Sequence, residues 1–344
     1  MTDTLAWVDA LVFQIRWQLA LSLAGEVEAT RVLPPAPGIP VQTTVAYQPI
    51  GVVTVIVPFN WPIAILAAAL PHALLAGNTA IVKPPPTTPL ATTRLVQRVA
   101  EKLPPGVLNV ITGRDSEMTG LIDNPDVAKV CFTGSVNGGK RIMEMAARSL
   151  TRVTLEPGLS ARLDNVVLGH GLAEGTTMGP LHQPAQKAFV ADIIDEAKAS
   201  GATVLEFGEL PDGDLADGNF LRPALVIDPD PALRVVTQEQ FGPVVPVIPY
   251  DDDEAVRMAN DTWAGLGASV WTADTDTDTR LGGQLECGYV RVNDHGANRP
   301  DLRAPFGGMR HSGMGREQDI EGVRAFQDTR SITHTANETQ QAAH

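Results

Sequence analysis

Hydrophobic residues along the first half of the chain occur in short runs that predict buried strands. A proline-rich stretch is followed by an alternating segment around TTVAYQP and then by the continuous apolar run GVVTVIVP. Further short runs come after it, separated by segments with helical periodicity: TAIVK, VLNVI, AKVCF and RVTLE. Short apolar strands that alternate with helices are typical of a parallel sheet covered on both faces. The pattern therefore predicts an α/β fold with a doubly wound parallel sheet.

The second half of the chain repeats this alternation less regularly. A helix is expected over residues 183–201 and another over DDDEAVRMAND. Strands are expected in ATVLEF, in the strand-rich stretch FLRPALVIDPDP before EQFGPVVPVIPY, and in ASVWT and GYVRVN, with a further helix between the last two. The pattern also predicts an amphipathic helix at the N-terminus, a helix near SEMTGLI, a glycine-rich loop in APFGGMRHSGMGRE and a frayed polar tail. These elements indicate a second α/β domain.

Glycine and polar residues follow the strands of the first half, in PFNWP, KPPP, TGRD, TGSVNGG and EPGLS. Because the carboxyl ends of parallel strands meet at one edge, where such sheets bind ligands, we expect these segments to converge. The sequence FTGSVNGG places Gly134 and Ser135 between a strand and a helix, which suits the binding of a pyrophosphate. A tight turn without a ligand would show the same glycine spacing.

Composition and charge limit the kinds of molecule that the protein is expected to bind. With 344 residues, 44% hydrophobic and 19% charged, the chain can form two domains with sizeable cores. Its formal net charge of -14 and pI near 4.9 oppose nucleic acid and anionic membranes, which favours a small-molecule ligand. Cys131 and Cys287 are its only cysteines, so we expect neither a disulfide framework nor a metal site. No apolar run reaches the roughly 20 residues needed to cross a bilayer, and we expect a cytoplasmic protein.

Seven segments, taken together and in order, resemble the aldehyde dehydrogenase superfamily from about Ala20 to Thr333. They are PFNWP, IVKPPP, PPGVLNVITG, FTGS, VTLEPG, QEQFGPV and APFGGMRHSGMGRE. The resemblance implies an N-terminal helix and oligomerisation strand in residues 1–50, a dinucleotide-binding domain in 51–158 and a truncated catalytic domain in 159–313. Residues 314–344 would contain a second oligomerisation strand and the polar tail. It also implies a homodimer or a higher homo-oligomer.

The resemblance assigns roles to individual residues. Glu156 of VTLEPG matches the general base, and Asn60 of PFNWP matches the amide that stabilises an oxyanion. Asp294 and His295 fall in the loop at the mouth of the substrate site. The cofactor, NAD or NADP, would contact Lys83, Gly134, Ser135, Glu239 and Phe241. The alternatives are a helix cap for Asn60 and solvated charges for Lys83 and Glu239.

The chain also departs from the family pattern. Only twelve residues separate Glu156 from Gly169, so several dozen residues of the usual pattern are absent, and the nucleophilic cysteine with them. The N-terminal region is also shorter than usual. Pro86 stands where the family often has an acid that bonds the adenosine ribose, which predicts weak or lost cofactor binding. Cys131 is expected in the core and Cys287 away from the site, so neither is expected to replace the missing thiol.

Three functions stay open at this point. The first is an NAD(P)-binding oxidoreductase-like protein of the family that takes a small carbonyl-type substrate and lacks the usual cysteine. The second is a non-redox enzyme that uses Glu156 as an acid or base for cyclisation, dehydration or hydrolysis. The third is a pseudoenzyme, catalytically silent, that serves in binding or assembly. The fold alone does not choose among them.

Overall fold

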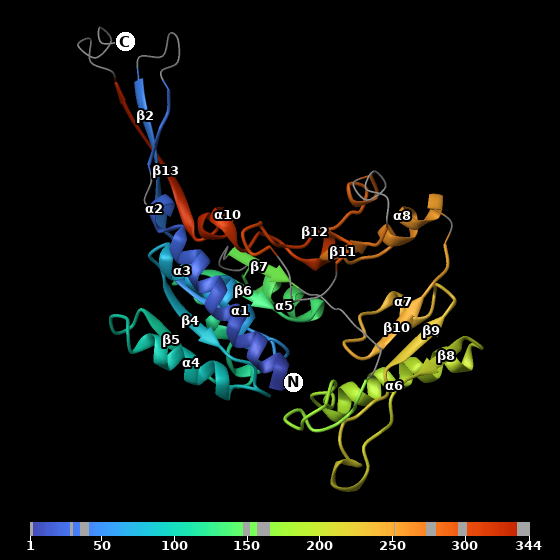
Figure 1. Cartoon of the computed structure of the whole chain (residues 1–344). Helices are drawn as coiled ribbons and strands as arrows, with labels where there is room; N and C mark the ends of the chain where they lie inside the picture. Colours follow the sequence, from blue (N-terminus) through green and yellow to red (C-terminus); the bar gives the residue numbers. More distant parts are fainter. Residues whose placement is uncertain are drawn as a thin grey trace.

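The computed structural model describes residues 3–27, 30–34, 41–146, 152–156, 166–250, 252–272, 280–294 and 301–335. Figure 1 shows a sheet with helices on it, an arm of long strands that projects from one end, and a second group of strands on the other side.

The central feature is a sheet of five parallel strands in the order β5-β4-β3-β6-β7. Its strands are β3 (Val52–Ile56), β4 (Thr79–Lys83), β5 (Leu108–Val110), β6 (Val127–Thr133) and β7 (Arg152–Glu156). These are the five apolar runs of the first half, so the predicted parallel sheet is confirmed. The runs are rich in valine and isoleucine, which pack well on a pleated surface that is covered on both sides.

Helices cover this sheet. They are α3 (Pro62–Leu75), α4 (Leu90–Ala100) and α5 (Val136–Ala146). Leu66 and Leu70 of α3 are fully buried in the largest apolar cluster, together with valines of β3 and β4. The helix predicted near SEMTGLI is present only as two short 3-10 helices, η1 (Asp115–Glu117) and η2 (Thr119–Leu121). Gly120 lowers the helical propensity of this short connection.

The N-terminal helix α1 (Asp3–Ser22) lies against α3 and is followed by the short α2 (Ala24–Val27). The Asp9 carboxylate accepts hydrogen bonds from the backbone N–H groups of Ala64, at 2.7 Å, and Ile63, at 3.4 Å. The helix is confirmed, but apolar residues also occupy its outer side, where Trp7 is 72% exposed. No helix among the described residues is both long and apolar enough to cross a bilayer.

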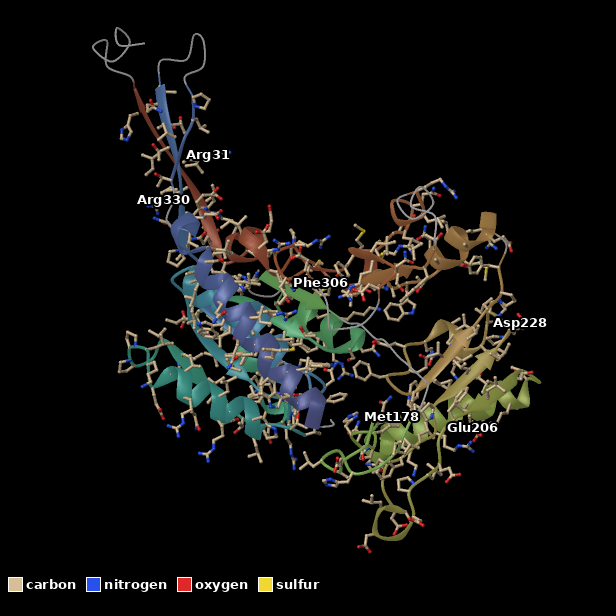
Figure 2. All side chains as sticks on the ribbon, viewed as in Figure 1. Arg31, Met178, Glu206, Asp228, Phe306 and Arg330 are labelled. Carbon is tan, nitrogen blue, oxygen red and sulfur yellow. The ribbon has the colours of Figure 1, made fainter. Side chains whose placement is uncertain are left out.

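The projecting arm pairs strands from the two ends of the chain. Strand β13 (Gln327–Thr335) runs antiparallel to β2 (Val41–Pro49), and β1 (Arg31–Val32) flanks β2 on the other side. The pairing of the two strands expected to form the oligomerisation element is thus present within the chain. Figure 2 shows side chains, including Arg31 and Arg330, along the arm. Helix α10 (Asp319–Arg324), which the sequence pattern did not predict, precedes β13.

The second group of strands forms two separate small sheets. Strands β8 (Thr203–Glu206), β9 (Ala224–Ile227) and β10 (Val244–Val247) form one sheet in the order β10-β9-β8. Strands β11 (Gly267–Val270) and β12 (Tyr289–Val292) form the other. The connecting helices are α6 (Pro184–Ala199), α7 (Arg234–Thr237) and α8 (Asp252–Asn260).

Most elements expected in the second half are confirmed, although much of the helix expected between β11 and β12 lies outside the described residues. The glycine-rich loop is present and contains one short turn, η4 (Arg310–Ser312), while η3 (Gly213–Leu215) lies in a loop before β9. The domain boundaries inferred from the family resemblance stay a prediction.

Candidate functional site

The strand register brings four strand ends to one edge of the five-stranded sheet. Ile56 of β3 pairs with Lys83 of β4 and with Phe132 of β6. Thr133, the next residue of β6, pairs with Glu156 at the end of β7. The backbone of Glu156 therefore lies at the same edge as the FTGS turn, whereas its side chain lies outside the described residues.

The FTGS turn leads directly into α5. The Ser135 hydroxyl accepts a hydrogen bond from the Gly138 N–H at 3.1 Å, and the Ser135 carbonyl accepts one from the Gly139 N–H at 2.9 Å. A Cβ added at Gly134 would come within 2.4 Å of the Phe132 ring, so glycine is needed for the turn to close over that ring. Packing against Phe132 is therefore enough to explain the glycine at this turn. The turn also presents the N-terminus of α5 at the sheet edge.

Lys83 at the end of β4 is not a solvated charge. It is 2% exposed, and its Nζ donates a hydrogen bond to the carboxylate of Asp115, whose side chain is 80% exposed. Asp115 begins η1, directly after the TGR segment. Pro86 is exposed and offers no side-chain acceptor. The structure thus places a carboxylate from a different loop beside Lys83.

Asn60 lies in the loop between β3 and α3, and it does not cap the helix. The N-cap residue of α3 is Trp61, which makes no capping side-chain hydrogen bond, and Asp9 serves the first N–H groups instead. The Asn60 Oδ1 atom is buried and has no hydrogen-bond partner among the described residues. Buried amide groups normally have partners, so an unpaired one suggests a ligand contact.

An aromatic cluster joins the Asn60 loop to the QEQFGPV segment. The Phe59 ring stacks on the His182 ring with centroids 3.7 Å apart and meets the Phe241 ring edge-on at 5.6 Å. The predicted catalytic amide and one predicted cofactor contact, about 180 positions apart in the chain, therefore lie near each other. Burial lowers the pKa of His182, which favours the neutral form of the stacked ring.

Phe241 adopts a strained backbone conformation, with φ of 48°. The Gln186 Nε2 donates hydrogen bonds to the carbonyls of Gln240, at 2.6 Å, and Phe241, at 3.4 Å, which hold the turn in place. Glu239, two residues earlier, is half-buried, and this burial raises the pKa of its carboxyl group. Strained residues beside a perturbed acid are common at binding sites.

The predicted substrate-mouth residues are less informative. The Asp294 carboxylate forms an ion pair with the Arg291 guanidinium at 3.3 Å, which partly balances its negative charge. Arg291 lies in β12, three residues before Asp294 in the chain. His295 lies outside the described residues. No cluster of three metal-ligating side chains occurs among the residues that the structure describes.

The sequence model described as "Aldehyde dehydrogenase family" matches residues 8–163 and 157–332. The chain belongs to the aldehyde dehydrogenase family. It is 33% identical over 343 residues to the geranial dehydrogenase of Castellaniella defragrans, covering 84% of this chain and 70% of that one. It is 33% identical over 356 residues to the phenylacetaldehyde dehydrogenase of Pseudomonas fluorescens, covering 87% and 70%.

Solved structures of the family have the same fold. The betaine aldehyde dehydrogenase of Staphylococcus aureus in complex with NAD+ superposes with a TM-score of 0.88 at 27% identity, covering 98% of this chain and 77% of that one. An aldehyde dehydrogenase-like α/β fold is therefore confirmed. The structural relative binds NAD+.

Burial raises the pKa of both cysteine thiols, which disfavours the thiolate form. Cys131 is buried in β6, and burial raises the pKa of its thiol to about 11. Burial also raises the pKa of Cys287, and its Sγ contacts the Tyr289 carbonyl at 3.4 Å. The expectation that Cys287 lies away from the site stays a prediction, although Cys287 lines a cavity that Glu239 also lines.

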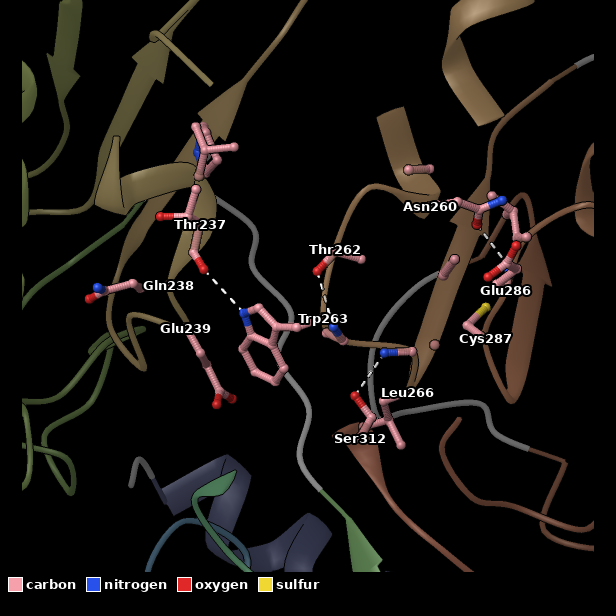
Figure 3. Close-up of a pocket in the computed structure, with 18 of the residues that line it drawn as sticks. Thr237, Gln238, Glu239, Asn260, Thr262, Trp263, Leu266, Glu286, Cys287 and Ser312 are labelled. Atoms are coloured by element: carbon pink, nitrogen blue, oxygen red, sulfur yellow. Dashed lines mark hydrogen bonds between the residues drawn. The ribbon is translucent and has the colours of Figure 1, made fainter. Parts of the chain in front are cut away.

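That cavity, of about 350 Å³, lies among α7, β10, β11 and the loop before β12. Figure 3 shows Glu239 on one side, Glu286 and Cys287 on the other, and the Trp263 ring between them. The Trp263 Nε1 donates a hydrogen bond to the Thr237 carbonyl at 3.1 Å. No motif or hydrophobic pattern predicts this cavity, the contact of Lys83 with Asp115 or the stacking of His182 on Phe59.

Proposed function

We propose that this chain binds NAD across the carboxyl edge of the five-stranded sheet. The pyrophosphate would meet the backbone of Gly134 and Ser135 at the N-terminus of α5, where N–H groups and the helix dipole favour an anion. The convergence of β3, β4, β6 and β7 in register carries the proposal, because it puts Ser135 and Lys83 on one edge. The family relative that binds NAD+ supports it.

The two ends of the dinucleotide would have separate contacts. Lys83 and the Asp115 carboxylate suit the adenosine ribose, because a carboxylate accepts hydrogen bonds from the ribose hydroxyls. Glu239 and Phe241 would hold the nicotinamide ribose. The buried, unpaired Oδ1 of Asn60 and the exposed carboxylate of Asp115 are polar groups that a bound ligand would satisfy. The residues present therefore fit the cofactor.

The reacting groups that we assign are Asn60 and Glu156. NAD, when bound, supplies a hydride acceptor to the site. The Asn60 amide would donate a hydrogen bond to a substrate oxygen as negative charge develops on it. Glu156 would remove a proton from water or from a substrate hydroxyl at the end of β7. A small carbonyl compound is the substrate class that these two groups suit.

We infer that the usual thiol step is absent and that the chain is shortened internally. In the alignment with the geranial dehydrogenase, 84% of the 344 residues is about 289, whereas the alignment spans 343 positions, so about 54 positions of the relative face gaps. The two stretches matched by the family model meet at residues 157–163, directly after Glu156. Thiol-dependent aldehyde oxidation is therefore not the expected reaction.

Calorimetric titration with NAD and then NADP tests the binding proposal. We expect saturable binding of NAD, lost when Ser135→Asp places a negative charge at the pyrophosphate position and retained in Ser331→Asp, a matched control on the distant arm. Binding by neither dinucleotide would favour the non-redox enzyme or the silent binding protein.

A second experiment assigns the chemistry. With NAD present and aldehydes, hydroxyaldehydes and esters screened, any turnover should fall at least about 100-fold in Glu156→Gln, the loss typical of a general base. Cys131→Ala and Cys287→Ala should leave it near the wild-type value. Loss of turnover in a folded cysteine variant would restore a thiol mechanism, and NAD binding without any turnover would support a pseudoenzyme.

Self-association through the arm is the further part of this proposal. Strand β13 offers a nine-residue edge, and among the described residues only β2 pairs with it. Exposed edges of this kind tend to pair with other chains. We expect a dimer or a larger homo-oligomer by light scattering at micromolar concentration, and a monomeric mass would contradict it. We also propose that the chain divides into the domains inferred from the family resemblance, with boundaries at residues 1–50, 51–158, 159–313 and 314–344.

A further inference from the structure

A carboxylate from a neighbouring loop meets the lysine at the end of β4. Ile111, which follows β5, donates its backbone N–H to the Val82 carbonyl at 3.0 Å, so the loop after β5 runs beside the end of β4. Asp115 lies at the end of this loop and accepts a hydrogen bond from Lys83. The parallel pairing of β4 with β5 therefore accounts for a contact between side chains 32 positions apart.

Hydrogen bonds within η1 fix the backbone at Asp115. The Glu117 N–H donates to the Arg114 carbonyl at 3.0 Å, and the Arg114 N–H donates to the Glu117 carboxylate at 3.2 Å. The Met118 N–H donates to the Asp115 carbonyl at 3.4 Å. The backbone that carries the Asp115 carboxylate is therefore held by the turn itself.

The two partners of this contact differ in their exposure to solvent. The Lys83 side chain is 3% exposed and the Asp115 side chain is 80% exposed. A buried ammonium needs its counter-charge, because loss of one partner leaves an uncompensated charge in a poorly solvated place. The contact uses the Oδ1 atom of Asp115, and a carboxylate has about four acceptor positions on its two oxygens. Asp115 therefore keeps acceptor capacity toward a ligand on its solvent side.

We propose that Asp115 makes this strand end select NAD over NADP, which rests on the proposed binding of the adenosine ribose beside Lys83. NAD has a ribose 2′-hydroxyl, which donates a hydrogen bond to a carboxylate. NADP has a phosphate on that oxygen, and the phosphate would meet the Asp115 carboxylate as a like charge. Lys83 offsets little of this repulsion, because its own charge is balanced by Asp115. The carboxylate therefore favours one dinucleotide and opposes the other.

The selecting acid comes from a different loop from the one in which the family resemblance places it. Pro86, in the KPPP segment after β4, is exposed and has no side-chain acceptor. Asp115 comes from the segment after β5 and reaches the same strand end through its contact with Lys83. Discrimination between the two dinucleotides therefore survives the proline at position 86.

The same turn also carries a cation. Arg114 is exposed and directly precedes Asp115. A guanidinium binds phosphate well, so a preference for NADP would make Arg114 the selecting residue instead. Asp115 is the stronger candidate because it is the residue of this turn that contacts Lys83, at the end of β4.

Titration of the full chain with 5′-AMP and with adenosine 2′,5′-bisphosphate tests the proposal, because these probes differ only in the 2′-phosphate and contain no nicotinamide. We expect the wild-type chain to bind 5′-AMP at least about tenfold more tightly. Asp115→Asn keeps a side-chain acceptor and removes the charge, so this ratio should fall to about threefold or less. Glu117→Gln removes the same charge from the same turn, where the carboxylate bonds the Arg114 N–H, and should keep the wild-type ratio.

A measurement on the wild-type chain keeps the proposal testable if Asp115→Asn does not fold. Salt screens the repulsion between an exposed carboxylate and a phosphate, so the ratio of the two affinities should fall as the ionic strength rises. A ratio that does not change with ionic strength would overturn the electrostatic selection, and so would a wild-type ratio retained in a folded Asp115→Asn.

Titrations with NAD and NADP separate this inference from the proposed function. NAD should bind at least about tenfold more tightly than NADP. Saturable NAD binding with an equal affinity for NADP would leave the proposed function in place and overturn the selection. Tighter binding of NADP that is lost in Arg114→Gln would assign the selection to Arg114 and overturn the role of Asp115. Binding of neither dinucleotide and neither probe would overturn both proposals.

Discussion

The five-stranded sheet and the strands β8 to β12 are built from the same alternation of strand and helix, yet they close differently. In the first region, each new strand pairs with one already in the sheet, and α3 fills the space above β3 and β4. In the second region, the crossover through α8 joins two sheets that do not pair within the part of the chain that the structure describes, and a cavity of about 350 Å³ lies between them. Local pattern alone therefore does not ensure a closed sheet.

The difference separates what each region can do. The first region presents aligned strand ends, a buried lysine and a helix N-terminus at one edge, which suits the dinucleotide binding that we propose. The second region contributes Glu239 and Phe241 from a turn held by Gln186, beside an open cavity. The aromatic contact of Phe59 with Phe241 is one link between them. We therefore expect cofactor binding to depend mainly on the first region.

The largest expected effect comes from matched core substitutions in the two regions. Leu70 and Ile193 are both 0% exposed, in separate apolar clusters. Leu70→Ala and Ile193→Ala should each lower the free energy of unfolding by about 3 kcal/mol. In urea denaturation followed by circular dichroism, we expect two transitions, with each variant lowering only one midpoint.

The control for this pair is Leu205→Ala in β8, where the side chain is 45% exposed and the expected loss is about 0.5 kcal/mol or less. A single transition shifted equally by both core variants would show that the two regions unfold as one unit.

The next effect concerns a buried histidine in the first region. Burial lowers the pKa of His72 on α3 from 6.5 to about 4, so it is neutral in the folded chain. Below pH 6.5 the unfolded chain takes up a proton that the folded chain does not, so stability falls as the pH drops toward 4. The loss at pH 5 is about 2 kcal/mol. Urea midpoints measured at pH 7 and pH 5 should show this loss in the wild-type chain and not in His72→Leu. An equal change of midpoint in both proteins would contradict the prediction.

Much of the first region could be predicted because its signals are local. Valine-rich runs of five residues predict buried strands, and glycines between a strand and a helix predict the FTGS turn. The shortness of the helical segments at SEMTGLI has a local reason too, since a short connection that contains Gly120 forms 3-10 helices more readily than an α-helix.

The contacts that the sequence did not predict join distant positions. Asp9 bonds the start of α3, 54 and 55 residues away, and Asp115 meets Lys83 across two strand ends. His182 stacks on Phe59 although neither residue carries a motif for such a contact.

A smaller effect is expected at the contact between α1 and α3. Asp9 is buried, and this burial raises the pKa of its carboxyl group despite the two backbone hydrogen bonds that lower it. Asp9→Ala removes both hydrogen bonds to the start of α3 and should cost about 1 kcal/mol of unfolding free energy. Asp9→Asn keeps a side-chain acceptor and should cost less. Equal losses in the two variants would show that the negative charge matters more than the capping contact.

The smallest effect separates two sources of a ribose acceptor at the edge of the first region. Pro86 offers none, so Pro86→Glu should tighten NAD binding by roughly fivefold, the equivalent of one hydrogen bond of about 1 kcal/mol. The contact of Asp115 with Lys83 means that a carboxylate is already near, so Asp115→Ala should weaken NAD binding by a similar factor. The double variant should return to the wild-type affinity in a fluorescence titration, because it has one acceptor again. If Asp115→Ala leaves the affinity unchanged while Pro86→Glu raises it, Asp115 serves only Lys83; if neither changes it, the adenosine does not bind at this strand end.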